Sequence, residues 1–135
     1  METTLIDKLA WIYLKDRKIL STRSRGKDVW YIPGGKREQG ESDHEALLRE
    51  VKEELCIDLL PETVQYLGTF KAQAHGKPEG TFVQMTCYTG DFTGTLQPAA
   101  EVEEMTYLTS DVDKNLLSPV DVIILAYLKE HELID

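Results

Sequence analysis

Apolar residues occur in short runs that polar turns separate, and this pattern predicts a chain with several strands. The runs that predict strands span residues 8–14, 19–22, 64–74, 81–89 and 105–109. The polar turn 15–18 is predicted to join the first two runs in a hairpin, because so few residues separate them. A shorter apolar segment, 29–32, ends at the chain breaker Pro33-Gly34-Gly35.

Two further segments are predicted to be helices, because each begins with a capping pattern. Residues 42–55 contain no Gly or Pro, and Ser42 is followed three positions later by Glu45, as in a capping box. Near the end of the chain, Ser118 precedes a proline and is followed three positions later by Asp121, after which apolar residues recur at helical spacing. Strands in hairpins with a helix in the middle and another at the end predict an α+β fold, or a mixed sheet between helices.

Composition and charge narrow the function classes. The 135 residues suit one domain, and 15 Lys and Arg against 24 Asp and Glu give a net charge of −9. Such an acidic chain does not suit a nucleic acid polymer, because that binding relies on Lys and Arg. If the substrate is an anionic small molecule, a metal ion must bring positive charge to the site.

Targeting and cysteine patterns give two more expectations. The start of the chain lacks the basic region and apolar stretch of a secretory signal, and no apolar run is long enough for a membrane span. We therefore expect a cytoplasmic protein. Cys56 and Cys87 fall outside any metal-binding pattern and are predicted to be buried thiols.

The predicted helix 42–55 carries a dense acidic cluster. On a helical wheel Leu47, Val51 and Leu55 share one arc, and three carboxylates lie beside that arc rather than opposite it: Glu50, Glu53 and Glu54. Like charges at this spacing repel one another, and the neighbouring core adds a desolvation cost. A solvated acidic face is one interpretation. The other is a site for a hard divalent cation such as Mg²⁺, which would relieve the repulsion.

A Gly-Gly-Lys sequence precedes this helix. Gly34, Gly35 and Lys36 are predicted to form a flexible turn, where the backbone can approach a metal and a cation can approach anionic oxygens. Together with the acidic cluster, the turn indicates metal-assisted chemistry on a phosphorylated substrate.

These residues resemble a known signature, the Nudix box of the Nudix hydrolases. Gly35 is followed after five residues by Glu41 and after seven more by the sequence Arg-Glu-Val-Lys-Glu-Glu-Leu-Cys-Ile, residues 49–57. One position departs from the family pattern, since Cys56 stands where the family has a Gly that ends the helix. The resemblance implies a single Nudix domain over residues 1–135, with its box at 35–57, and an α/β/α sandwich with a mixed sheet between helices.

The resemblance also implies roles for individual residues. Glu50, Glu53 and Glu54 would bind Mg²⁺ or Mn²⁺, with a carbonyl group of Gly34 or Gly35. The same glutamates would include the catalytic residues, and Glu101 is the candidate general base outside the box. Arg23 and Lys36 are the candidate phosphate contacts, and Glu41 and Arg49 are the candidate supporting residues.

The implied reaction is attack of water on a diphosphate linkage of a nucleoside diphosphate joined to another group. The short chain is most similar to small MutT-type members that cleave nucleoside triphosphates, including oxidised ones. Nucleotide sugars, ADP-ribose and dinucleotides stay open as substrates. A catalytically silent nucleotide sensor is the alternative from another class, although all box glutamates are present here. The oligomeric state is left open between monomer and homodimer.

Overall fold

The computed structural model describes residues 4–74 and 76–135. In chain order its elements are β1 (Thr4–Trp11), β2 (Leu14–Lys15), β3 (Lys18–Ser24), β4 (Gly34–Lys36), α1 (Asp43–Leu55), β5 (Asp58–Leu59), the 3₁₀ helix η1 (Pro61–Thr63), β6 (Gln65–Gln73), β7 (Thr81–Thr89), β8 (Phe92–Thr93), β9 (Val102–Leu108), the 3₁₀ helix η2 (Lys114–Leu116) and α2 (Pro119–Glu130).

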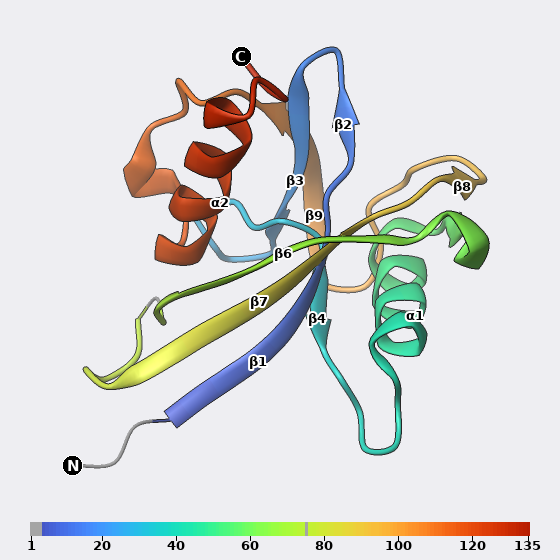
Figure 1. Ribbon diagram of the computed structural model, residues 1–135, viewed down its shortest axis with the longest axis horizontal. Helices are drawn as coiled ribbons and strands as arrows, with labels where there is room; N and C mark the ends of the chain where they lie inside the picture. Colours follow the sequence, from blue (N-terminus) through green and yellow to red (C-terminus); the bar gives the residue numbers. More distant parts are fainter. Residues whose placement is uncertain (1–3, 75) are drawn as a thin grey trace.

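The largest sheet is mixed. Its four strands lie in the order β4-β1-β7-β6, and β1 runs parallel to β7, whereas the other two pairs are antiparallel. A three-stranded sheet β2-β3-β9 and a small β5-β8 pair complete the strands (Figure 1). The mixed sheet agrees with the prediction.

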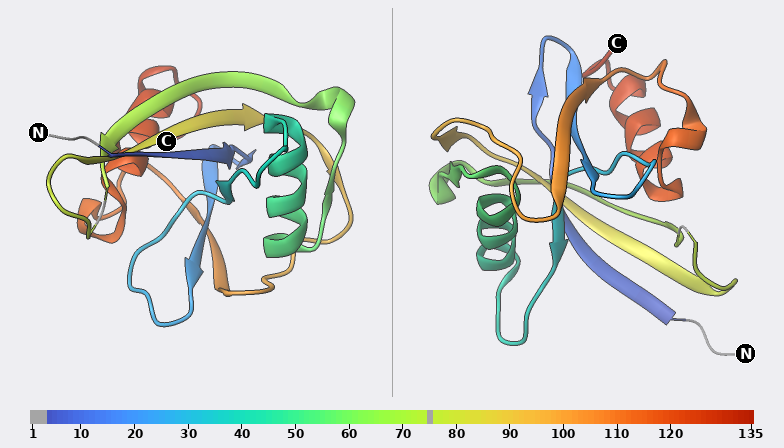
Figure 2. Two further views of the ribbon diagram at one scale, coloured as in Figure 1. Left: turned by 90° about the horizontal axis from the view of Figure 1, so that it is seen from below. Right: turned by 180° about the vertical axis from the view of Figure 1, so that it is seen from behind.

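The two helices cover opposite sides of the strands, as Figures 1 and 2 show. Alternation along β1 explains why both sides are apolar, because successive side chains of a strand point to opposite faces. Leu9 and Trp11 pack with Leu47 of α1 in one buried cluster, and Ala10 packs with Ile124 of α2 in the other. This arrangement confirms the predicted mixed sheet between helices.

The hairpin predicted at the turn 15–18 is confirmed, but the run 8–14 is not its first strand. β1 ends at Trp11 and pairs with β4 and β7, not with β3. The hairpin is formed by β2 and β3 instead, and its connecting residues Asp16 and Arg17 have φ angles of 53° and 61°. Two residues with positive φ are typical of the type I′ turn, whose twist suits a two-residue connection.

The prediction of a flexible turn at Gly34-Gly35-Lys36 is also wrong, because these residues form β4. Gly34 and Gly35 pair with Ala10 and Leu9 of β1. At Gly34, which has φ 146°, an added Cβ would collide with the backbone of Leu9, and at Gly35 it would lie 2.5 Å from Glu50 Cδ. The glycines therefore serve close approach rather than flexibility.

The ends of α1 match the sequence pattern. Ser42 Oγ accepts a hydrogen bond from Glu45 N at 3.2 Å, and Glu45 Oε1 accepts one from Ser42 N at 2.9 Å, which completes the capping box. Cys56 is the C-cap, in the left-handed conformation with φ 62°. Its thiol is exposed, so the prediction of a buried thiol is wrong for Cys56 and confirmed for Cys87. The cap lies beyond the last buried residue of the helix, where the chain turns away.

The start of α2 differs from its prediction. The helix begins at Pro119 as expected, but Ser118 makes no capping hydrogen bond through its side chain. Asp121 is 1% exposed, and its Oδ2 accepts a hydrogen bond from Ile32 N at 3.1 Å. The predicted capping box is wrong because the Asp121 carboxyl group turns into the protein.

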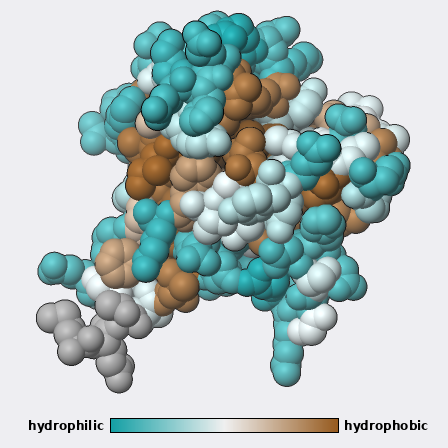
Figure 3. Space-filling view, viewed as in Figure 1, coloured by the Kyte–Doolittle hydropathy of each residue, from teal (hydrophilic) through white to brown (hydrophobic). Residues whose placement is uncertain are grey.

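The surface gives few functional hints. In the space-filling view of Figure 3, hydrophilic residues cover most of the face, and hydrophobic residues show in the region of α2. The large hydrophobic residues that are exposed come from different elements: Leu5, Tyr66, Leu116, Ile123 and Leu133. Scattered exposure of this kind needs no functional explanation. In the described part of the chain, no helix is long and apolar enough to cross a membrane.

Candidate active site

A cavity of about 430 Å³ lies where β1, β3, β4 and α1 meet. Its wall is chemically mixed, with both charges represented among the lining residues. The acidic ones are Glu50, Glu54 and Glu101, and the basic ones are Lys8, Lys27 and Lys36. Acidic and basic residues thus line one cavity that opens to solvent, which suits a metal together with an anionic substrate.

Packing of α1 fixes the position of the two box glutamates in this wall. Leu47, Val51 and Leu55 are fully buried, so the helix cannot rotate about its axis without exposing them. Helical spacing then directs Glu50 and Glu54 to one edge of that apolar face.

Glu54 is held against β4. Its Oε1 accepts a hydrogen bond from Gly34 N at 3.0 Å. Burial is the main cause that raises the pKa of Glu54 to about 8, and the carboxylates of Glu50 and Glu101 add to it. A carboxylate in this position is costly when it is ionised without a cation, and a divalent ion would remove that cost.

Glu50 lies against the next residue of β4. The space that a Cβ would fill at Gly35 is occupied by the Glu50 carboxylate. Arg49 Nη1 donates to Glu50 Oε1 at 3.0 Å, but burial still raises the pKa of Glu50. A side chain at position 35 would therefore displace the carboxylate of Glu50.

A second network joins the end of β4 to α1. Arg49 Nε and Nη2 donate to the two oxygens of the Glu41 carboxylate at 2.7 and 2.9 Å, and Nη2 also donates to Lys36 O at 3.1 Å. Hydrogen bonds from Arg49 lower the pKa of Glu41 to about 2. Arg49 therefore ties the loop before α1 to the helix, beside Glu50.

Glu53 and Glu101 are exposed, whereas Glu50 and Glu54 are partly buried. The side chain of Glu53 is 54% exposed, and its Oε2 lies 3.4 Å from Arg49 Nη1. Glu53 is not among the residues that line the cavity, whereas Glu101 lines it from the segment just before β9. Glu101 thus faces the cavity from a different element than the box glutamates.

Arg23 points away from the cavity. Its neighbours Thr22 and Ser24 line the cavity and Arg23 does not, at a point where the register of β3 against β9 is irregular. There it forms ion pairs with Glu103 and Glu104 of β9. Lys36, the other predicted phosphate contact, does line the cavity.

Sequence reasoning missed several residues of this region, among them Lys8 and Asp121. Lys8 reads as one polar position in an apolar strand, and Asp121 matches a capping pattern, so neither stands out in the sequence. In the structure Lys8 lines the cavity, and Asp121 binds Ile32 N directly behind the wall. Burial raises the pKa of Asp121 to about 7. The pairing of β1 with β4 and the docking of α2, both non-local, bring them here.

The donor set suits a hard cation. Over residues 4–74 and 76–135, no three acidic, His or Cys side chains converge as a complete metal cage. Mg²⁺ does not need one, because it keeps several waters and binds through one or two carboxylates and substrate phosphates. The carboxylates of Glu50 and Glu54 beside the β4 backbone fit that mode of binding.

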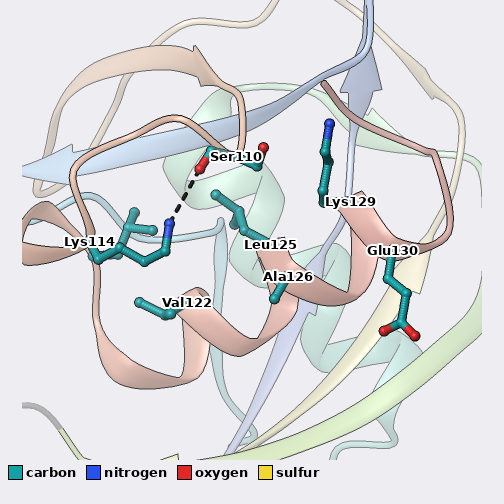
Figure 4. A pocket seen from close by; sticks show the side chains of 8 residues that line it. Ser110, Lys114, Val122, Leu125, Ala126, Lys129 and Glu130 are labelled. Atoms are coloured by element: carbon teal, nitrogen blue, oxygen red, sulfur yellow. Dashed lines mark hydrogen bonds between the residues drawn. The ribbon is translucent and has the colours of Figure 1, made fainter.

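A second hollow of about 310 Å³ lies beside α2 and has a different character (Figure 4). Apolar residues such as Val122, Leu125 and Ala126 form much of it, and Lys114 Nζ donates to Ser110 O at 3.3 Å. Of the described residues that line this hollow, Glu130 alone is acidic. The carboxylate-lined cavity is therefore the better candidate for catalysis.

Comparison with known proteins agrees with this geometry. A family model described as the NUDIX domain matches residues 8–125. The chain belongs to the Nudix family. It is thus a Nudix hydrolase, in a family that typically requires a divalent metal and acts on nucleotide pyrophosphates.

Individual relatives support the same assignment. CTP pyrophosphohydrolase of Escherichia coli strain K12 is 33% identical over 98 residues, which cover 69% of this chain and 68% of that protein. The solution structure of the E. coli ORF135 protein has a TM-score of 0.72 and 29% identity, and the match covers 98% of this chain and 96% of that one. A MutT NUDIX hydrolase from Burkholderia pseudomallei, with a TM-score of 0.75, 21% identity and coverage of 91% and 97%, shares the fold.

Proposed function

We propose that this Nudix hydrolase is a Mg²⁺- or Mn²⁺-dependent pyrophosphohydrolase of nucleoside triphosphates, with residues 1–135 acting as a single catalytic domain. The observation that carries the proposal is the cavity that has Glu50 and Glu54 on one wall and Lys36 among its other lining residues. The cytoplasm is the proposed location, and the active form is a monomer or a homodimer.

In this proposal Glu50, Glu53 and Glu54 hold the cation, together with a carbonyl group of Gly34 or Gly35. When bound, the cation would lower the pKa of a water molecule and offset charge on the phosphate oxygens. Glu53 is exposed at the outer side of this group and would complete it from the solvent side.

The other residues act through position and charge. Glu101 faces the cavity from outside the box, so it can accept a proton from the attacking water. Lys36 binds a substrate phosphate, and Arg49 with Glu41 orients the loop and Glu50. Arg23 as a phosphate contact stays a prediction, since it would first have to leave Glu103 and Glu104.

The substrate class rests on similarity. The relative named as a CTP pyrophosphohydrolase supports a nucleoside triphosphate, and possession of Glu50, Glu53 and Glu54 favours an enzyme over a silent sensor. Nucleotide sugars, ADP-ribose and dinucleotides are the alternatives.

A substrate screen tests the proposal. Purified protein with Mg²⁺ or Mn²⁺ is incubated with CTP, other nucleoside triphosphates, nucleotide sugars, ADP-ribose and dinucleotides, and the released products are quantified. We expect a nucleoside triphosphate to be cleaved to a monophosphate and pyrophosphate, and excess EDTA to abolish the reaction. Preference for another class would correct the substrate, and undiminished hydrolysis in EDTA would refute the metal mechanism.

A further inference from the structure

Two lysines of the cavity lie directly opposite each other. Lys8 of β1 is the cross-strand partner of Lys36 of β4 in the antiparallel ladder. Directly opposed residues project to the same face of a sheet, and both of these line the cavity. The structure therefore places two positive charges side by side on one wall.

This arrangement costs free energy in the unliganded protein. Like charges directly opposite on paired strands are destabilising. Lys8 is also half-buried, and burial first, then the charge of Lys36, lowers its pKa. Asp121, Glu54 and Glu50 act in the opposite direction but do not reverse the effect.

Neither lysine has a close side-chain partner among the residues that the structure describes. Among residues 4–74 and 76–135, the ion pairs within 4.0 Å and the side-chain hydrogen bonds include none from the ammonium group of Lys8 or Lys36. The arginines nearby are different, since Arg37 is paired with Asp7 and Asp43, and Arg49 with Glu41. The donors of the two lysines are thus left available to a ligand.

We propose that Lys8 and Lys36 form a two-lysine clamp that binds a phosphate oxyanion of the substrate, with Lys8 as the inner lysine. An oxyanion between the two ammonium groups would relieve their repulsion and accept hydrogen bonds from both. The two lysines line the same cavity as Glu50 and Glu54, so the held phosphate would share that cavity with the proposed cation. This inference rests on the proposed function and adds to it a residue that the Nudix box does not contain.

A different role for Lys8 would be that of a counter-ion, which neutralises Asp121, Glu54 and Glu50 and has no contact with substrate. The two roles predict opposite effects on the unliganded protein. If Lys8 is a clamp residue, Lys8→Met keeps or raises the thermal midpoint in EDTA, because a repelling, half-buried charge is removed. If Lys8 is a counter-ion, the same variant lowers that midpoint.

Binding of inorganic pyrophosphate in EDTA, measured by calorimetry, tests the clamp without turnover. We expect Lys8→Met to weaken binding about tenfold or more, because the variant loses a hydrogen bond between charged groups. Lys8→Arg keeps the charge and is expected to retain part of the affinity. The matched control is Lys71→Met, which removes an exposed lysine of β6 and is expected to bind as the wild type does.

Kinetics and a neutral probe complete the test. With the best nucleotide substrate, Lys8→Met should raise KM at least as strongly as it lowers kcat, and binding of the uncharged nucleoside should be unchanged. Unaltered pyrophosphate binding in Lys8→Met, or no binding to the wild type, would overturn the clamp. An equal loss for nucleoside and pyrophosphate would also overturn it. If the wild type cleaves no nucleotide yet binds pyrophosphate through Lys8, the proposed function fails and the clamp stands.

Discussion

Glu54 of α1 and Asp121 of α2 reach one short segment of chain from opposite sides. Glu54 accepts a hydrogen bond from Gly34 N, and Asp121 accepts one from Ile32 N two residues earlier. Burial raises the pKa of both, to about 8 for Glu54 and about 7 for Asp121. The two acids therefore look alike in bonding and in charge cost.

Their surroundings separate them. Glu54 lines the cavity together with Glu50 and Glu101, so a cation can reach it and offset its charge. Asp121 is sealed inside the protein, and its Oδ1 has no hydrogen-bond partner among the described residues. The comparison indicates that a buried acid with access to a cation is suited to metal chemistry, whereas a sealed one is expected to act mainly on stability and its pH dependence.

The largest expected effect comes from Glu54→Gln, which keeps the shape of the side chain and removes its charge. If Glu54 holds the catalytic cation, kcat for the best substrate should fall about 10³-fold or more. The exposed Glu62→Gln of η1 is the matched control and should retain wild-type turnover. An unchanged rate in Glu54→Gln would show that Glu54, like Asp121, takes no part in catalysis.

A smaller effect, on stability alone, is expected from Asp121→Asn. The folded pKa of Asp121 is about 7 against an ordinary 3.8, so its stabilising protonated form is fully present below about pH 4 and is lost as the pH rises towards 7. The asparagine variant should therefore gain stability relative to wild type over that interval, by on the order of 1–3 kcal/mol at pH 7–8. Urea unfolding at several pH values measures this difference, and a difference that does not vary with pH would show that Asp121 does not titrate as described.

The N-termini of α1 and α2 also differ, because the side chain of Ser42 caps its helix and that of Ser118 does not. Ser42→Ala should cost about 1 kcal/mol of stability, because the Ser42 hydroxyl accepts the capping hydrogen bond from Glu45 N. Ser118→Ala should be neutral or stabilising, because Ser118 Oγ is buried without a partner in the described structure. Urea unfolding of both variants at one pH makes the comparison. Equal losses would mean that Ser118 caps α2 after all.

The smallest effect is expected at the other end of α1. Cys56→Gly removes the Cβ from a residue with φ 62°, where glycine is favoured. The thiol is exposed, so little packing is lost, and the gain should be between zero and about 1 kcal/mol. A clear loss in urea unfolding would show that the side chain of Cys56 contributes contacts that outweigh the backbone strain.

The features that the sequence could predict are those that depend on residues close together in the chain. The spacing of Glu50 and Glu54 beside Leu47 and Val51 is local, so the helix and its acidic edge can be predicted. Cys56 at the helix end is predictable for the same reason. These features need only helical periodicity and a known signature.

Non-local contacts could not be predicted in this way. Lys8 lies opposite Lys36 because β1 pairs with β4. The sequence pattern predicts a turn, not a strand, at the residues of β4. Asp121 matches a capping box as well as Glu45 does, and only the docking of α2 beside Ile32 turns its carboxyl group inward. Arg23 is held outside the cavity by its ion pairs with Glu103 and Glu104 of β9, and this pairing of β3 with β9 is also non-local.

The central claim is that α1 holds a divalent cation through Glu54, and the most direct measurement is the thermal midpoint with and without Mg²⁺. We predict that Mg²⁺ raises the midpoint of the wild type, because binding to the native state alone stabilises it. The rise should be lost in Glu54→Gln, while the midpoint of that variant in EDTA equals or exceeds the wild-type value. A wild type that Mg²⁺ does not stabilise, or a Glu54→Gln variant with an undiminished Mg²⁺ response, would contradict the claim.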